Sequence, residues 1–148
     1  MWSMKEIFIR GNVPSSKNSK VNGKFFSKTV QKYLRYHGIK SFSSRKKTVE
    51  RYKTIPMTFP VKKLKALFKS KNPPFIVSFH FVRDSKRKFD FGNITQILFD
   101  LMTAFDIIED DNMDITVPAA YKKDSRWYSL DKDNPGVYIK VEEDEKEV

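Results

Sequence analysis

The chain has 148 residues and a formal net charge of +11, with 39% hydrophobic residues, 32% charged residues and no cysteine. This length suits one domain with a single core, and the lack of cysteine excludes disulfides, thiolate metal sites and a cysteine nucleophile. No apolar run reaches the roughly 18 residues needed to cross a bilayer, and no signal peptide is evident. We therefore expect a soluble intracellular protein.

The positive charge is concentrated in one part of the chain. Residues 15–53 hold 12 of the 29 Lys and Arg residues but only one of the 18 acids, Glu50, and the remainder is balanced. Such a surface favours a polyanionic partner, because each neutralised phosphate releases counterions. A solvated basic face that only aids solubility is the alternative.

The first part of the chain mixes short predicted elements with loops. In chain order, its pattern predicts a strand at residues 5–10, a loop at 11–22, a short strand at 24–26 and a helix at 27–36. Ser27 is a favourable N-cap for this helix, and Gly38 would end it. Residues 41–60 are basic and polar and match no pattern.

The rest of the chain is more regular. The pattern predicts an amphipathic helix at 61–68, a strand at 75–82, a charged turn at 84–88, a helix at 92–104, and strands at 115–121 and 136–141. Residues 142–148 read as an acidic tail. This order indicates an α+β fold in which residues 1–141 form a single domain, with a mixed sheet packed by two or three helices.

The helix at 92–104 has a clear buried stripe. Its apolar residues recur at the helical period: Ile94, Ile97, Leu98, Leu101, Met102 and Phe105. Asn93, Gln96 and Asp100 line one flank of this stripe, at about 100° per residue. These polar groups should border the core without entering it.

Acids lie at both ends of the same helix. Asp90 precedes it, and Glu109, Asp110 and Asp111 follow after a short connector. Crowded carboxylates repel each other, and a divalent cation removes that repulsion and supports phosphate chemistry. Alternatively, Asp90 only caps the helix and the later acids form a solvated turn. A shared metal site requires the connector to fold back, so that Asp110 or Asp111 meets Asp90.

This segment resembles the RusA-type Holliday junction resolvases, small metal-dependent endonucleases often carried by prophages. Their motif reads D-x-D-N, then a Lys three residues on, then a helix and D-D. The corresponding residues here are Asp90-Phe91-Gly92-Asn93, Gln96 and Asp110-Asp111. The loop VPSSKNSK, the stretch FFSKTVQKYLR and the strands FIVSFHFVRD and PGVYIKVEE also resemble family segments, whereas residues 41–72 read as a basic insertion.

The resemblance implies Mg²⁺-dependent cleavage of four-way DNA junctions, with Mn²⁺ as a substitute ion. The family-style site residues are Asp90, Asp110 and Asp111 as catalytic metal ligands, supported by Asn93, Gln96 and Asp100. A homodimer is expected, since two equivalent strands need two equivalent sites. The resemblance further implies a cytoplasmic, bacterial or phage-encoded protein with no membrane contact and no small-molecule cofactor.

The candidate DNA contacts are basic or polar residues in two segments. They are Lys17, Asn18, Lys20, Lys24, Lys28 and Arg35 in the first, and Lys86, Arg87 and Lys88 in the second. We expect them to position phosphates and not to read bases. The second group lies next to Asp90, where it would hold the scissile strand.

Two positions depart from the family motif. Gly92 replaces its second Asp, which removes a carboxylate, and Gln96 replaces its Lys, which removes a cation that would steady the phosphate or the leaving group. Asp100, Glu109 or water are candidates for the missing ligand, and Lys88 for the missing cation. A catalytically impaired protein that binds branched DNA without cutting it is therefore the alternative, and a basic structural or ribosome-associated module is a third.

Overall fold

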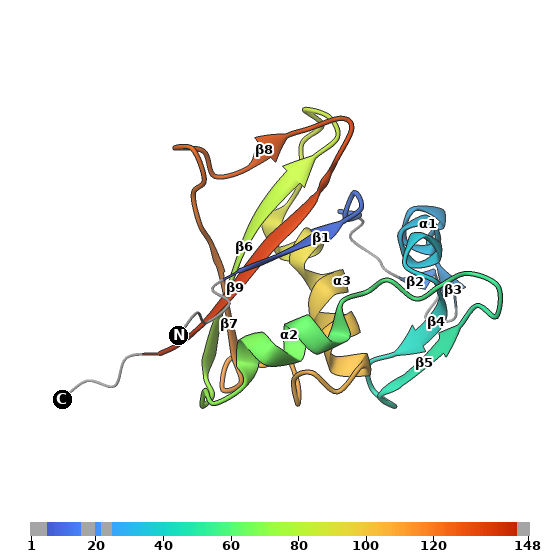
Figure 1. Cartoon of the computed structure of the whole chain (residues 1–148), viewed down its shortest axis with the longest axis horizontal. Coiled ribbons are helices and arrows are strands. Elements are labelled where there is room, and N and C mark those ends of the chain that lie inside the picture. Colours follow the sequence, from blue (N-terminus) through green and yellow to red (C-terminus); the bar gives the residue numbers. More distant parts are fainter. Residues whose placement is uncertain (1–5, 16–19, 22–24, 145–148) are drawn as a thin grey trace.

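A mixed β-sheet and three helices make up an α+β fold (Figure 1). The computed structural model describes residues 6–15, 20–21 and 25–144. Its elements are β1 (Ile7–Arg10), β2 (Lys20–Val21), β3 (Phe25–Phe26), α1 (Lys28–Tyr36), β4 (Ile39–Ser43), β5 (Thr48–Arg51), α2 (Val61–Phe68), β6 (Phe75–Arg83), α3 (Phe91–Ala104), β7 (Thr116–Ala120), β8 (Ser129–Leu130) and β9 (Gly136–Glu143). None of the helices in this part of the chain is long and apolar enough to span a membrane.

The main sheet has the strand order β1-β9-β6-β7, and β8 pairs with the end of β6. The pairs β1–β9 and β9–β6 are antiparallel, whereas β6–β7 is parallel, with Phe75 opposite Thr116 and Phe79 opposite Ala120. Parallel neighbours need a crossover connection. Helix α3 is that crossover, so the sheet topology itself sets the acids that precede α3 apart from those that follow it.

One hydrophobic cluster joins the sheet to the helices. The strand residues Val77, Phe79 and Phe81 of β6 alternate toward it, as period-two packing requires. In α3 the predicted stripe from Ile94 to Met102 is buried, and Phe105 is half-buried. Helix α3 therefore cannot rotate about its axis without exposing apolar surface, which fixes the direction of its polar flank.

Local capping confirms the expected limits of α1. The Ser27 hydroxyl accepts a hydrogen bond from the Val30 N–H at 3.3 Å, as an N-cap does. Gly38 follows the helix with φ +75°, and a Cβ there would lie 2.3 Å from the Pro56 carbonyl oxygen. Glycine is required at this turn for both reasons.

The sequence interpretation missed the β4–β5 hairpin within residues 41–60. Strand β4 contacts α1 and α3, and its Phe42 is buried and stacks on Phe26 with ring centroids 4.9 Å apart. Helix α2, which lies within residues 41–72, buries Leu64, Leu67 and Phe68. The residues read as a basic insertion thus contribute to the core, and the turn at Lys47 is brought to the C-terminal end of α3.

His37, the C-cap residue of α1, is buried beside aromatic rings. Its Nδ1 lies 3.1 Å from the Thr58 hydroxyl, and the ring centroids of Tyr33 and Phe59 are 4.8 Å and 5.6 Å away. Burial lowers the pKa of His37 to about 4, and the Arg10 carbonyl opposes this only in part. The neutral imidazole is therefore the folded form.

This shift predicts a loss of stability on mild acidification. Because the unfolded imidazole binds a proton near pH 6.5 and the folded one only near pH 4, the free energy of unfolding should fall as pH drops through this window. The contribution of His37 is about 3 kcal/mol. Urea unfolding of His37→Phe should show a correspondingly shallower decline between pH 6.5 and 4, and equal pH dependence of both proteins would contradict the assignment.

Candidate functional site

The connector after α3 folds back along the helix, as a shared site requires. Asp106 adopts a left-handed conformation with φ 57°, and the Ile107 N–H donates to the Met102 carbonyl at 2.8 Å. Ile108 is buried at 3% exposure and anchors the returning chain in the core. The acids Asp110 and Asp111 are therefore carried back beside the polar flank of α3.

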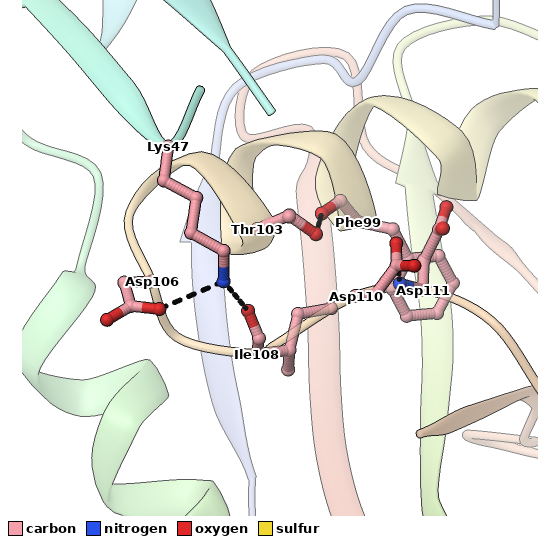
Figure 2. A network of polar contacts seen from close by, with 7 residues as sticks. All are labelled: Lys47, Phe99, Thr103, Asp106, Ile108, Asp110 and Asp111. Atoms are coloured by element: carbon pink, nitrogen blue, oxygen red, sulfur yellow. Dashed lines mark hydrogen bonds and ion pairs between the residues drawn. The ribbon is translucent and has the colours of Figure 1, made fainter. Parts of the chain in front are cut away.

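A lysine from the β4–β5 turn holds this connector in place. Figure 2 shows the Lys47 ammonium between the Asp106 carboxylate and the Ile108 carbonyl, at 3.0 Å and 3.3 Å from their oxygens. The hydrogen bond and the charge of Lys47 lower the pKa of Asp106. The hairpin that the sequence did not predict is thus joined directly to the acidic turn.

Gln96 brings two carboxylates together. Its Nε2 donates to Asp100 Oδ1 and to Asp111 Oδ2, each at 2.9 Å, which uses both amide hydrogens. Asp100 and Asp111 are half-buried, and Gln96 is exposed. The expected polar flank of α3 is therefore present, and Asp111 meets it at the position where the family motif has its Lys.

Asp110 is oriented differently from Asp111. Its Oδ1 accepts the Asp111 N–H at 2.8 Å, and its Oδ2 accepts from the Asn112 side chain at 3.1 Å. These hydrogen bonds, led by that from the Asp111 backbone, lower the pKa of Asp110, and the charge of Lys47 adds to the effect. Asp110 therefore shapes the acidic turn and stays ionised.

Asp90 caps α3, as one of the sequence alternatives proposed. Its Oδ1 accepts the Asn93 N–H at 3.1 Å. Asp90 lies about 15 Å of helix rise from Asp100 but only about 9 Å from Gln96, at 1.5 Å per residue. The carboxylates that share a hydrogen-bond partner are consequently Asp100 and Asp111, with Asp90 nearer the N-terminal end of the helix.

Gly92 stands where a second carboxylate would face Asp90. A Cβ at this exposed position would lie 3.2 Å from Asp90 Oδ1. That atom belongs to a side chain on the surface, so a small adjustment would accommodate a larger residue. The family's second Asp would therefore add its charge directly beside Asp90, and glycine leaves that place without an anion.

A cavity of about 470 Å³ lies against the acidic turn. It is lined by Ser44, Arg45, Lys47, Asp100, Thr103, Glu109, Asp110, Asp111 and Asn112. The acids come from α3 and its connector, and the cations come from the β4–β5 turn. Sequence reasoning missed Arg45 and Lys47 as site residues; the basic run at 45–47 was visible, but its position opposite the acids was not.

The candidate DNA contacts are only partly described. Lys17, Asn18 and Lys24 lie outside the described residues, as does the side chain of Lys20. Lys28 and Arg35 are exposed on α1, where the Arg35 guanidinium lies 5.4 Å from the Tyr52 ring centroid. Lys86, Arg87 and Lys88 are exposed in the loop that leads from β6 to Asp90.

The donor set suits Mg²⁺ only with additional oxygens. Within residues 6–15, 20–21 and 25–144, no group of three or more His, Asp or Glu side chains is arranged to hold an ion. Asp100 and Asp111 instead offer two converging carboxylates, and rotation of Gln96 would add its amide oxygen. Mg²⁺ commonly binds through one or two carboxylates together with water and substrate phosphates, so an ion at Asp100 and Asp111 would need further oxygen ligands of this kind.

No protein-family model, curated protein or solved structure matches the chain. The resemblance to the RusA-type resolvases consequently rests on the sequence motifs alone.

The role of Lys47 can be tested by amide exchange. In Lys47→Met the connector loses its two hydrogen bonds to the hairpin, so exchange at residues 106–111 should become roughly 5- to 10-fold faster. Lys46→Met removes the same charge from an exposed neighbouring position and should leave these rates unchanged. Equal acceleration in both variants would show that charge alone, and not the contact, stabilises the turn.

Proposed function

We propose that the protein is a Mg²⁺-dependent, structure-selective endonuclease that cuts four-way DNA junctions by phosphodiester hydrolysis. One observation carries the proposal: the connector folds back so that Asp111 meets Gln96, the residue at the motif position of the family Lys. A solvated turn would not need this contact. The arrangement supports a site built from both sides of α3, as in the sequence motif.

The residues of the site divide into three roles. Asp111 and Asp100 would hold Mg²⁺, with the Gln96 oxygen as a further donor, whereas Asp90 lies about 15 Å of helix rise from Asp100. The bound ion supplies an activated water and neutralises charge that develops on the phosphate. Arg45 and Lys47 face the acids across the same cavity and would steady the phosphate, which replaces the cation lost at position 96.

The wider surface fits a nucleic-acid substrate. The excess positive charge of residues 15–53 would attract phosphates without reading bases. A C₂ homodimer would present two sites to the two equivalent strands of a junction. On the family resemblance, we place this activity in the bacterial or phage-infected cytoplasm.

A second candidate is a protein that binds branched DNA without cutting it. It is favoured by the Gln96 amide, which satisfies Asp100 and Asp111 with no ion, and by Gly92, which leaves Asp90 as a helix cap. Such a protein would keep the basic surface, while hydrogen bonds from Gln96 would stabilise its carboxylates in place of an ion.

Cleavage of a labelled synthetic junction in Mg²⁺ or Mn²⁺ separates the two candidates. Asp111→Asn and Asp100→Asn should each reduce the rate by about 100-fold or more, because each removes a carboxylate from the proposed ion site. Asp114→Asn neutralises an exposed acid outside the cavity on the same loop and should cut normally. Tight junction binding with no cleavage by the wild-type protein in either ion would establish the binder.

A gain-of-function variant tests the two motif departures directly. Gly92→Asp combined with Gln96→Lys places the family residues at both positions and should raise the cleavage rate by about 10-fold or more. The matched control is Gly92→Asn with Gln96→Met, which has similar side-chain sizes but no new charges. An increase with the control pair, or none with the charged pair, would count against a resolvase-type site.

A further inference from the structure

A second cavity, of about 610 Å³, is lined by the end of β6 and the loop that follows it, together with Asn12, Pro14, Ser15, Thr29 and Lys132, and shares no lining residue with the acidic one. Three cations line it, Arg83, Arg87 and Lys132, together with one acid, Asp84. Neutral donors complete its wall, among them Ser15 and Thr29. Among the described lining residues the charge is therefore clearly positive.

Arg83 is the unusual member of this set. It is the last residue of β6, follows the core-facing alternation of Phe79 and Phe81, and is only 5% exposed. Its Nη1 donates to the Val13 carbonyl at 2.6 Å, and its guanidinium carbon lies 4.9 Å from the Phe89 ring centroid. The Nε–H has no hydrogen-bond partner among the described residues.

A buried guanidinium needs an anion. Burial lowers the pKa of Arg83, and the charge of Asp84 opposes this, yet an arginine remains protonated in proteins. The ion pairs formed by the described residues do not include Arg83. Because a buried charge without an ion-pair partner is unfavourable, a bound oxyanion would stabilise the Arg83 guanidinium.

The N-terminus of α1 adds to the same potential. Thr29, in the first turn of α1, lines the cavity, and that turn contains no acid. Helix N-termini favour negative charge through their aligned peptide dipoles. The positive potential in the cavity thus has three sources on separate elements. They are the dipole of α1, the buried guanidinium of Arg83, and the exposed cations Arg87 and Lys132.

We propose that this cavity binds a phosphate group and that its occupant is a backbone phosphate of nucleic acid. Arg87 lies three residues before Asp90, in the basic loop that leads into α3, so the cavity includes one of the residues expected to contact DNA. The inference goes beyond cleavage, since the cavity would hold a phosphate in a protein that only binds DNA.

Binding of inorganic phosphate to the full chain is the first test. We expect phosphate to raise the melting temperature relative to chloride at equal ionic strength. In Arg87→Gln/Lys132→Gln, phosphate affinity should fall by about 10-fold or more, whereas Lys62→Gln/Lys63→Gln, with the same charge loss on α2, should change it less than about 2-fold. These exposed positions avoid the risk of unfolding that a change at buried Arg83 would carry.

The source of the phosphate is the second test. A single-stranded oligonucleotide should displace inorganic phosphate, and the Arg87/Lys132 pair should weaken oligonucleotide binding about 5-fold more than the Lys62/Lys63 pair. If both pairs weaken it equally while phosphate still needs Arg87 and Lys132, the nucleic-acid occupant is overturned and free phosphate or a nucleotide takes its place. If phosphate stabilises both pairs equally, or no better than chloride, the cavity is not a phosphate site.

Failure of this inference is distinguishable from failure of the proposed nuclease. Suppose that junction cleavage depends on Asp111 but that Arg87 and Lys132 do not contribute to phosphate binding. The phosphate-site proposal would then be wrong and the nuclease proposal would stand. Phosphate binding at the cavity in a protein that cuts no junction would lead to the reverse conclusion.

Discussion

The parallel pairing of β6 with β7 is the constraint from which the rest of the structure follows. Two parallel neighbours cannot be joined by a tight turn, so α3 must cross the sheet between them. Its apolar stripe then fixes its rotation, and its polar flank faces away from the core. This crossover sets the acids before the helix apart from those after it, and the connector that follows α3 then turns back so that Asp111 meets Gln96.

Charge opposition between two distant segments completes the acidic site. The carboxylates of α3 and its connector face Arg45 and Lys47 of the hairpin across one cavity. Neither group would be well placed alone, since crowded acids repel each other and an exposed hairpin turn has little to hold it. The contact of Lys47 with Asp106 and Ile108 links the two, so the hairpin is a structural part of the site as well as a source of positive charge.

Strongly periodic segments were predictable, and irregular ones were not. Helix α2 was predicted with its observed limits, α3 within one residue, and β6 within one residue, because each repeats its apolar side chains at a regular period. Strand β4 lacks such a period because a bulge lies between Ile39 and Ser41. Its buried residues Ile39 and Phe42 are therefore three residues apart, whereas a regular strand would place them two apart. The polar flank of α3 was predicted from the helical period, but the acid expected to meet Asp90 instead contacts Gln96 through Asp111. The position of Lys47 opposite the acids and the burial of Arg83 depend on tertiary packing that no local sequence pattern reveals.

The short strand β8 has a consequence for the basic cavity. It pairs Val82 with Ser129 and Arg83 with Leu130, and the Asp131 N–H donates to the Arg83 carbonyl at 2.9 Å. Arg83 is thus held by this ladder on one side, and on the other side its neighbour Val82 pairs with Gly136 of β9. A ligand that binds in the basic cavity would find Arg83 already fixed in position, so little conformational entropy would be lost on binding. Recognition at this end of the sheet should therefore depend on a rigid site and not on the ordering of a loop.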